Sequence, residues 1–339
     1  MKKIYLLTLF ITKILFSKKY KKKQKEINAD FKRQNINTCT FCLSNVKKLE
    51  YYQFCRKYNV KYDIYSCENC GHGFIKNPPD LDIMINSYYS NDYYSRSVHD
   101  YKITNEKKNQ FVKNYPIKNA LEIGCMHGEF VEYLNNKGID SIGCDIISNP
   151  KFVNKEKYIQ GDFLKINFNK KFDAIFSFAN LEHIEDPNAY IKKASSLLNT
   201  NGILVVTSVN SESIVSKKLY NEDIPMHLNI FNLNCLKLFL NKNKLIVENI
   251  SFDLKNLYHD YSEGYFIYKI LNLFKIKYTQ ILKEKCNFYI PYERLEKMIK
   301  QEYKFQNFFY KILYITDYFM NKLFKPKLNY QFLLIAKKI

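Results

Sequence analysis

The chain of 339 residues is long enough for one large domain and one small one. Hydrophobic residues make up 46% of it, which excludes a wholly disordered chain. The net charge of +20 is concentrated at the ends, with 11 Lys/Arg against 2 Asp/Glu in residues 1–34 and 16 against 7 in residues 255–339. A fold that binds nucleic acid would more often carry its excess positive charge around the central site, so nucleic acid is the less favoured partner.

Residues 1–35 form a basic leader. An apolar run from Ile4 to Phe16, interrupted by Lys13, is shorter than the roughly 20 residues needed to cross a bilayer. A polybasic stretch, Ser17–Lys25, comes next, where a secretory signal would have a cleavage site. Two interpretations stay open: a short helix docked on the domain, or an interfacial anchor. An anchor would allow peripheral contact with the inner membrane surface through residues 1–25 and 255–326.

Residues 36–80 contain two Cys-x-x-Cys pairs, Cys39 with Cys42 and Cys67 with Cys70. Two such pairs at this spacing predict a small zinc-ribbon domain with a structural zinc ion held by four thiolates. The alternative is four ordinary reduced cysteines, because nine cysteines in a chain of this length fit a reducing, cytoplasmic compartment. The nearby Cys55 and His72 are expected not to be ligands.

Residues 81–116 come after a proline-rich turn and are rich in tyrosine, which predicts a helical linker. Its tyrosines at positions 88, 89, 93 and 94 are expected mainly to bury their rings on the core. One or two of them are expected near the functional site.

From residue 117 to the end, strands alternate with helices. This pattern predicts an α/β domain with a doubly wound, mostly parallel seven-stranded sheet. The expected helices are Glu129–Lys137, one that opens at Asp186-Pro187 and ends at Gly202, and Leu233–Asn243. The expected strands are Ala120–Cys125, Ser141–Ile146, Lys157–Phe163, Phe172–Phe178, Ile203–Val209, Leu245–Phe252 and Tyr330–Lys337. The aromatic, basic residues 255–326 are expected to be a helical insertion.

The segment Leu121–Gly128 runs from a strand through a glycine turn into a helix. Gly124 permits a sharp turn, and Gly128 permits a close approach of a ligand to the start of the helix. The middle glycine of a dinucleotide-binding motif is absent, but this segment alone does not exclude a dinucleotide.

The ends of the next three strands carry further candidate ligands. Asp145, with Ile146 directly after it, is placed to bind ribose hydroxyls, and Asp162 and Phe163 are placed to contact an adenine ring. After the fourth strand comes the segment Asn180-Leu-Glu-His-Ile-Glu-Asp-Pro187. Taken in this order, the motifs resemble those of the class I S-adenosylmethionine-dependent methyltransferases over about residues 117–254 and the last strand. One departure is Met126, which stands where the family commonly has a second glycine.

The resemblance implies a contact to the S-adenosylmethionine cofactor for each matching residue. Asp145 and Ile146 would lie at the ribose, and Asp162 and Phe163 at the adenine. The residues implied at the methionine end are Glu122, Gly124, Cys125, Gly128 and Asn180.

Two histidines are candidates for chemistry at the methyl acceptor. Methyl transfer mainly needs positioning, and a hydroxyl acceptor also benefits from a general base. His183 comes after the fourth strand, and His227 lies in a Pro-x-His-Leu-x-x-Phe segment similar to one found at the acceptor site of related enzymes. His227 is slightly preferred as the base, and for His183 a structural role is equally open.

The acceptor class is inferred from the cysteine pairs and the residues next to them in the chain. The order of two cysteine pairs, an Asn-Pro-Pro turn and a Tyr-rich segment is similar to the start of bacterial enzymes that methylate sugars and glycans. The leading hypothesis is therefore methyl transfer to a sugar or glycan precursor, with lipid-linked precursors included. The alternatives are RNA or protein methylation, and a non-enzymatic module that binds zinc and a nucleotide.

Overall fold

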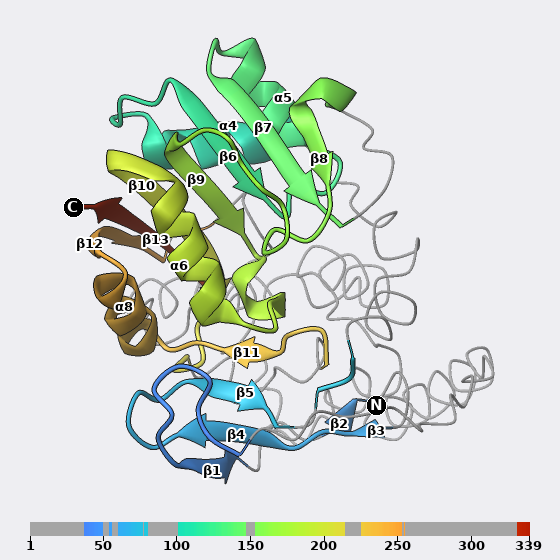
Figure 1. Cartoon of the computed structure of the whole chain (residues 1–339), viewed down its shortest axis with the longest axis vertical. Helices are drawn as coiled ribbons and strands as arrows, with labels where there is room; N and C mark the ends of the chain where they lie inside the picture. The colour runs from blue at the N-terminus through green and yellow to red at the C-terminus, as the bar shows by residue number, and fades with distance from the viewer. Residues whose placement is uncertain are drawn as a thin grey trace, which may run out of the picture. The chain divides into compact units, whose positions relative to one another are not determined.

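The computed structural model describes residues 37–49, 54–55, 60–76, 78–80, 101–146, 153–213, 225–252, 254 and 331–339 (Figure 1). The chain divides into two compact units. One unit is represented by the antiparallel strands β2 (Phe54–Cys55) and β3 (Val60–Lys61). The other comprises residues 31–53, 62–262 and 324–339. The expected leader, residues 81–100 of the linker and the insertion at 255–326 lie outside the described residues.

The larger unit contains a seven-stranded sheet in the order β12-β13-β10-β9-β6-β7-β8. Neighbouring strands from β10 to β8 run parallel, and β13 is antiparallel to both β10 and β12. This confirms the mostly parallel, doubly wound sheet. The strand bounds are Asn119–Ile123 (β6), Asp140–Asp145 (β7), Tyr158–Gln160 (β8), Phe172–Phe178 (β9), Leu198–Val209 (β10), Leu245–Ser251 (β12) and Gln331–Lys338 (β13).

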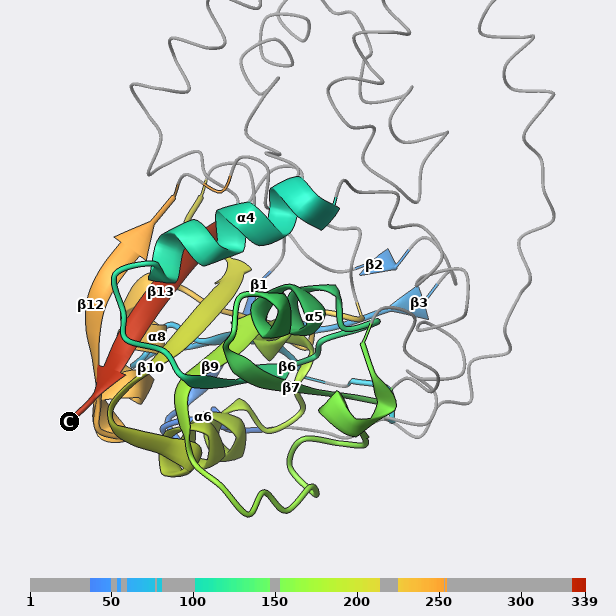
Figure 2. The same ribbon diagram turned by 90° about the horizontal axis from the view of Figure 1, so that it is seen from above.

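Helices cover both faces of this sheet, as Figure 2 shows. Successive strand residues point to opposite faces. Leu121 of β6 therefore packs in one cluster with helices α6 (Pro187–Leu197) and α8 (Leu233–Lys242), whereas Ala120 packs in another with α4 (Tyr101–Val112) and α5 (Glu129–Asn136). No helix among the described residues is long and apolar enough to cross a membrane.

Most element boundaries lie within two residues of the sequence-based expectation, but two regions differ by more. Gly202 was expected to end the helix that begins at Pro187, but α6 ends at Leu197 and Gly202 lies inside β10. An irregular pairing between Leu198 and Ile203 lets this strand start early, and backbone carbonyls crowd the space that a side chain at Gly202 would need. The third strand is shorter than expected because the chain turns at Gly161, whose N–H bonds to the Asp145 carbonyl.

A second sheet of the same unit has the order β1-β4-β5-β11. Its first three strands are β1 (Val46–Leu49), β4 (Ile64–Cys67) and β5 (Gly73–Ile75). We call residues 37–49 and 62–76 the cysteine ribbon. The fourth strand, β11 (Asn229–Ile230), comes from the region after the large sheet's β10, and it pairs antiparallel with β5 (Figure 1). The ribbon and the α/β domain thus share a sheet.

Candidate functional site

The glycine turn after β6 forms the centre of the expected cofactor site. Gly124 has φ 71° and Gly128 has φ 83°, both in the left-handed region that favours glycine. A side-chain carbon at Gly124 would overlap the Asn180 carboxamide, so the turn packs directly against the loop after β9. The structure therefore brings Gly124 and Asn180 together, as the sequence predicted.

Asp145 holds this turn in place. Its Oδ2 accepts a hydrogen bond of 2.7 Å from the Met126 N–H, and its side chain is buried. Met126 has φ 49°, which explains why glycine is common at this position and shows that the chain reaches the same conformation with a methionine. Asp145 thus has a structural contact besides its predicted contact with ribose. Ile146, beside it, is 36% exposed.

The residues expected to bind adenine lie in a turn that Lys193 holds by hydrogen bonds. Asp162 Oδ1 accepts from the Leu164 N–H at 2.9 Å, and Lys193 Nζ donates to the carbonyls of Phe163 at 2.7 Å and Leu164 at 3.1 Å. The Phe163 ring is buried and packs 4.9 Å from the Tyr190 ring. Stacking of Phe163 on adenine stays a prediction, and Lys193 gave no sequence signal because it lies far along the chain from this turn.

Glu122 is buried and forms an ion pair with Lys108 of α4, with 3.1 Å between Oε1 and Nζ. Burial raises the pKa of Glu122, while Lys108 opposes this shift. The Lys108 ammonium also lies 4.4 Å from the centre of the Phe178 ring. Sequence analysis missed Lys108 because nothing local distinguishes it from the other lysines of the linker.

Cys125 packs against Val131 and Val153 in a small cluster, and burial raises the pKa of its thiol. A side chain at Gly143 would overlap Cys125 Sγ. Cys125 therefore packs on apolar side chains, while the carboxylates of Glu122 and Asp145 raise the pKa of its thiol further, and its contact with the cofactor stays a prediction.

The two candidate histidines lie face to edge, with ring centres 4.6 Å apart and an interplanar angle of 78°. His183 ends the short helix η3 (Leu181–His183), and its Nδ1 lies 2.9 Å from the Met226 carbonyl oxygen. A carbonyl only accepts, so Nδ1 carries the proton, and the lone pair of the neutral ring is on Nε2. His227 is buried, and burial lowers its pKa to about 3. The structure thus brings together two histidines that are far apart in sequence.

Glu182 lies with the two histidines, and ligand atoms of all three are within 4.8 Å of one another. Its Oε2 accepts from Ser208 Oγ at 3.2 Å. One carboxylate and two imidazoles are ligands that suit a divalent transition metal. Asn180 lies two residues earlier, where its Oδ1 accepts from the Tyr190 hydroxyl at 3.1 Å.

The four cysteines of the two pairs also converge, with all their sulfur atoms within 4.8 Å of one another. Cys39 Sγ lies 3.6 Å from Cys70 Sγ, and Cys42 Sγ lies 3.3 Å from Cys67 Sγ. The N–H groups of Asn69 and Cys70 point to Cys67 Sγ at 3.4 Å each, and Gly71 comes next with φ 73°. Donors aimed at a sulfur favour its thiolate form, which is the form that binds metal.

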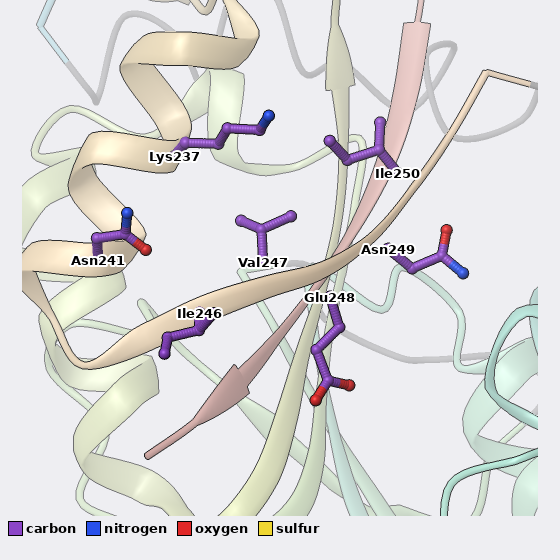
Figure 3. A pocket seen from close by; sticks show the side chains of 7 residues that line it. All are labelled: Lys237, Asn241, Ile246, Val247, Glu248, Asn249 and Ile250. Atoms are coloured by element: carbon purple, nitrogen blue, oxygen red, sulfur yellow. The ribbon is translucent and has the colours of Figure 1, made fainter.

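A pocket lies apart from these motif residues, between α8 and the edge strand β12 (Figure 3). Glu248 points away from Lys237 in this view and accepts a hydrogen bond from the Tyr115 hydroxyl at 3.1 Å. The lining residues are Lys237, Asn241, Ile246, Val247, Glu248, Asn249 and Ile250. None of them belongs to the predicted site.

Comparison with known proteins gives this geometry a family context. Residues 94–246 match the family model of a methyltransferase domain. This match agrees with the domain type expected from the motifs between Leu121 and Pro187. The matched range contains the glycine turn, Asp145, Asp162 and both candidate histidines.

Relatives of known function are similar over part of their length. The chain is 31% identical to the ubiquinone biosynthesis O-methyltransferase of Pelagibacter ubique over 33% of this chain and 49% of that protein. It is 29% identical to malonyl-[acyl-carrier protein] O-methyltransferase 2 of Ilyobacter polytropus over 42% of this chain and 60% of that protein. The chain spans about half the length of the curated relatives it matches.

Among solved structures, a SAM dependent methyltransferase from Archaeoglobus fulgidus matches with a TM-score of 0.44 and 19% identity. The match covers 74% of this chain and 100% of that one. None of these three proteins is named for a sugar or glycan acceptor, so that part of the expectation stays a prediction.

We predict that Gly124→Ala lowers the affinity for S-adenosylmethionine at least about tenfold, because its methyl group would displace Asn180. Gly138→Ala is a matched control, since Gly138 has a similar φ of 81° but no atom within 4 Å of an added carbon. The control should lose about 1 kcal/mol of stability and keep its affinity. Titration calorimetry measures the affinity of both variants for S-adenosylmethionine, and equal affinities would contradict the placement of the cofactor at this turn.

The buried His227 predicts a pH dependence of stability. Its pKa is lowered from 6.5 to about 3, so the unfolded chain takes up the proton first as the pH falls. The stabilisation is complete above about pH 6.5 and is lost on acidification toward pH 3, by about 2 kcal/mol between pH 7 and pH 5. Urea unfolding of the protein and of His227→Gln at these two pH values should show a smaller pH effect in the variant. Equal pH effects would show that His227 is not buried in its neutral form.

Proposed function

We propose that this protein is an S-adenosylmethionine-dependent methyltransferase that acts on a hydroxyl group. The observation that carries the proposal is the position of His183, which comes just after the strand end whose Asn180 packs on the glycine turn and has the His227 ring against it. A methyl acceptor must lie within reach of both the cofactor and a base, and this edge of the sheet offers both. The curated relatives are named as O-methyltransferases, which supports an oxygen acceptor.

The cofactor supplies an electrophilic methyl group on a sulfonium. The residues of the site fit it, because the buried Glu122 Oε2 has no hydrogen-bond partner among the described residues and can accept from the methionine end. Glu122, Asn180 and the turn would hold the methionine end, Asp145 and Ile146 the ribose, and Asp162 with Phe163 the adenine. Asp145 and Lys193 keep these segments in place through the hydrogen bonds to Met126 and to the Phe163 carbonyl.

We assign the general base to His183. Its Nδ1–H is bound to the Met226 carbonyl, so Nε2 is the atom that can accept a proton. His183 Nε2 would take up the hydroxyl proton of the acceptor as its oxygen is methylated. His227 is less suited to this role, because a pKa of about 3 is poorly matched to proton uptake near neutral pH. Its ring instead packs against His183 and limits how that ring can turn.

A sugar or glycan precursor, with lipid-linked forms included, is the acceptor that we propose. The convergence of the two Cys-x-x-Cys knuckles supports the ribbon on which this acceptor class was inferred. Contact with a membrane surface through residues 1–25 and 255–326, in a cytoplasmic protein, belongs to the same proposal. Those segments lie outside the described residues.

The cysteine ribbon supplies a second proposal, a structural zinc ion bound by Cys39, Cys42, Cys67 and Cys70. Four sulfur atoms at mutual distances within 4.8 Å form the donor set that zinc prefers in structural sites. Burial opposes the ionisation of Cys42, but hydrogen bonds from Ser44, Cys67 and Cys39 lower its pKa to about 6. Hydrogen bonds between thiols and burial instead raise the pKa values of Cys39, Cys67 and Cys70, so a bound zinc ion would displace the protons of these three thiols.

The acceptor class can be tested directly. Purified protein with methyl-labelled S-adenosylmethionine should label the lipid-linked or the soluble glycan fraction of a cell extract. Label in the nucleic-acid or protein fraction would replace the proposed acceptor by RNA or protein. No label in any fraction, together with measurable cofactor binding, would favour a non-enzymatic module.

His183→Asn should lower turnover by about 10² to 10⁴-fold, because it removes the base. The asparagine amide can still donate to the Met226 carbonyl, so the loop and the affinity for S-adenosylmethionine should be kept. His227→Asn should lower turnover less and also keep cofactor affinity. Steady-state kinetics and calorimetry distinguish the two variants, and full activity of His183→Asn would remove His183 from the mechanism.

Zinc analysis of the purified protein should give about one metal ion per chain. Cys42→Ser with Cys67→Ser should lose it, whereas Cys144→Ala, which removes a buried cysteine of β7, should keep it. The zinc site would be refuted by a purified protein that contains no metal and whose stability a chelator does not change.

A further inference from the structure

The segment that carries His227 is held by the cysteine ribbon. His227 lies two residues before β11, whose Asn229 and Ile230 pair with Phe74 and Gly73 of β5. The Ile75 N–H extends this pairing to the Leu228 carbonyl at 3.0 Å. The glycine turn, in contrast, is held by β6 and β7 of the large sheet. The glycine turn and the His227 segment therefore rest on two different sheets.

Two hydrogen bonds connect this segment to the loop after β9. His183 Nδ1 donates to the Met226 carbonyl at 2.9 Å, and Asn229 Nδ2 donates to the Ile184 carbonyl at 2.6 Å. They join the same two segments on either side of the facing histidine rings. The His183 ring cannot turn without loss of its bond to the Met226 carbonyl.

Asn229 also connects the segment to the cysteines. Because its Nδ2 donates to Ile184, its Oδ1 is the atom 2.9 Å from His72 Nε2, and this nitrogen must carry the proton. The other nitrogen, Nδ1, lies 4.0 Å from Cys39 Sγ. His72 and Asn229 are both buried. A continuous series of contacts thus runs from the cysteine cluster through His72 and Asn229 to the residue next to His183.

We propose that the cysteine ribbon is part of the acceptor half of the active site, with Asn229 as the positioning residue that sets the His183–His227 pair. The proposal rests on the proposed methyltransferase function. A misplacement of about 1 Å can cost about 10²-fold in rate, so a residue that fixes both histidine segments matters without touching the reacting atoms. Loss of the cysteine cluster should loosen residues 226–230 while the glycine turn stays ordered.

A matched pair of substitutions tests this role. Asn229→Asp keeps the acceptor for His72 but removes the donor to Ile184. Asn232→Asp makes the same chemical change three residues later: it removes only the hydrogen bond to the Gly71 carbonyl and keeps the α8 cap, in which Oδ1 accepts from the Cys235 N–H at 2.6 Å. Both variants are compared with the unmodified full-length protein.

The main readout is the ring nitrogen spectrum of His183 in protein labelled with ¹⁵N-histidine, which is practical because the chain has 6 histidines. Its signal is assigned through His183→Asn. Asn229→Asp should move this signal and speed amide exchange in residues 226–230 about tenfold, with exchange in residues 119–123 unchanged. Asn232→Asp should leave the His183 signal where it is. The same response in both variants, or in neither, would overturn the proposal.

Metal removal from the unmodified protein gives an independent second arm. Treatment with a thiol-directed mercurial and a chelator should speed exchange in residues 226–230 and move the His183 signal, with the dissociation constant for S-adenosylmethionine changed by less than about threefold. An unchanged His183 signal after removal of a bound metal would overturn the link to the ribbon. Failure of the unmodified protein to bind S-adenosylmethionine would instead overturn the proposed function, so the two failures are distinguishable.

Discussion

Parallel pairing of β6 with β7 and β9 is the constraint on which the rest of the structure depends. Parallel strands end at one edge of a sheet, so the loops after them meet there although they are far apart in sequence. The contact of Asn180 with Gly124 and the hydrogen bond from Met126 to Asp145 both cross this edge. Both contacts involve the glycine turn, so the segments that follow β6, β7 and β9 hold one another in place at this edge.

The parts of the fold that the sequence predicted are those with local signals. Strand and helix alternation, the glycines with positive φ and the N-cap of α6 at Asp186, which accepts from the Ala189 N–H at 2.9 Å, need only a few neighbouring residues. The Cys-x-x-Cys spacing belongs to the same class. These signals also explain why the candidate histidines could be chosen before their geometry was known.

The missed residues act over long distances in the sequence. Lys108 of α4 pairs with Glu122 of β6, 14 residues later, Lys193 holds a turn 30 residues earlier, and Asn229 bonds to His72 157 residues away. Each is a common polar residue whose role depends on the final packing. The two-residue strand β11 was equally hidden, because so short a strand has no periodicity to detect. The choice between His227 and His183 as the base likewise depends on burial, which the sequence does not reveal.

The shared sheet has a consequence for how such proteins can be divided or recombined. Sequence motifs suggest two exchangeable modules, a ribbon and a catalytic domain. The strand pairing contradicts this division, since β11 lies within the second module in the sequence but completes the sheet of the first. A fragment that starts after the ribbon would keep the glycine turn, which is expected to bind the methyl donor. Its β11 would lose the partner strand β5. In evolution, ribbon and acceptor segment would therefore have to change together, and a graft between relatives should carry both.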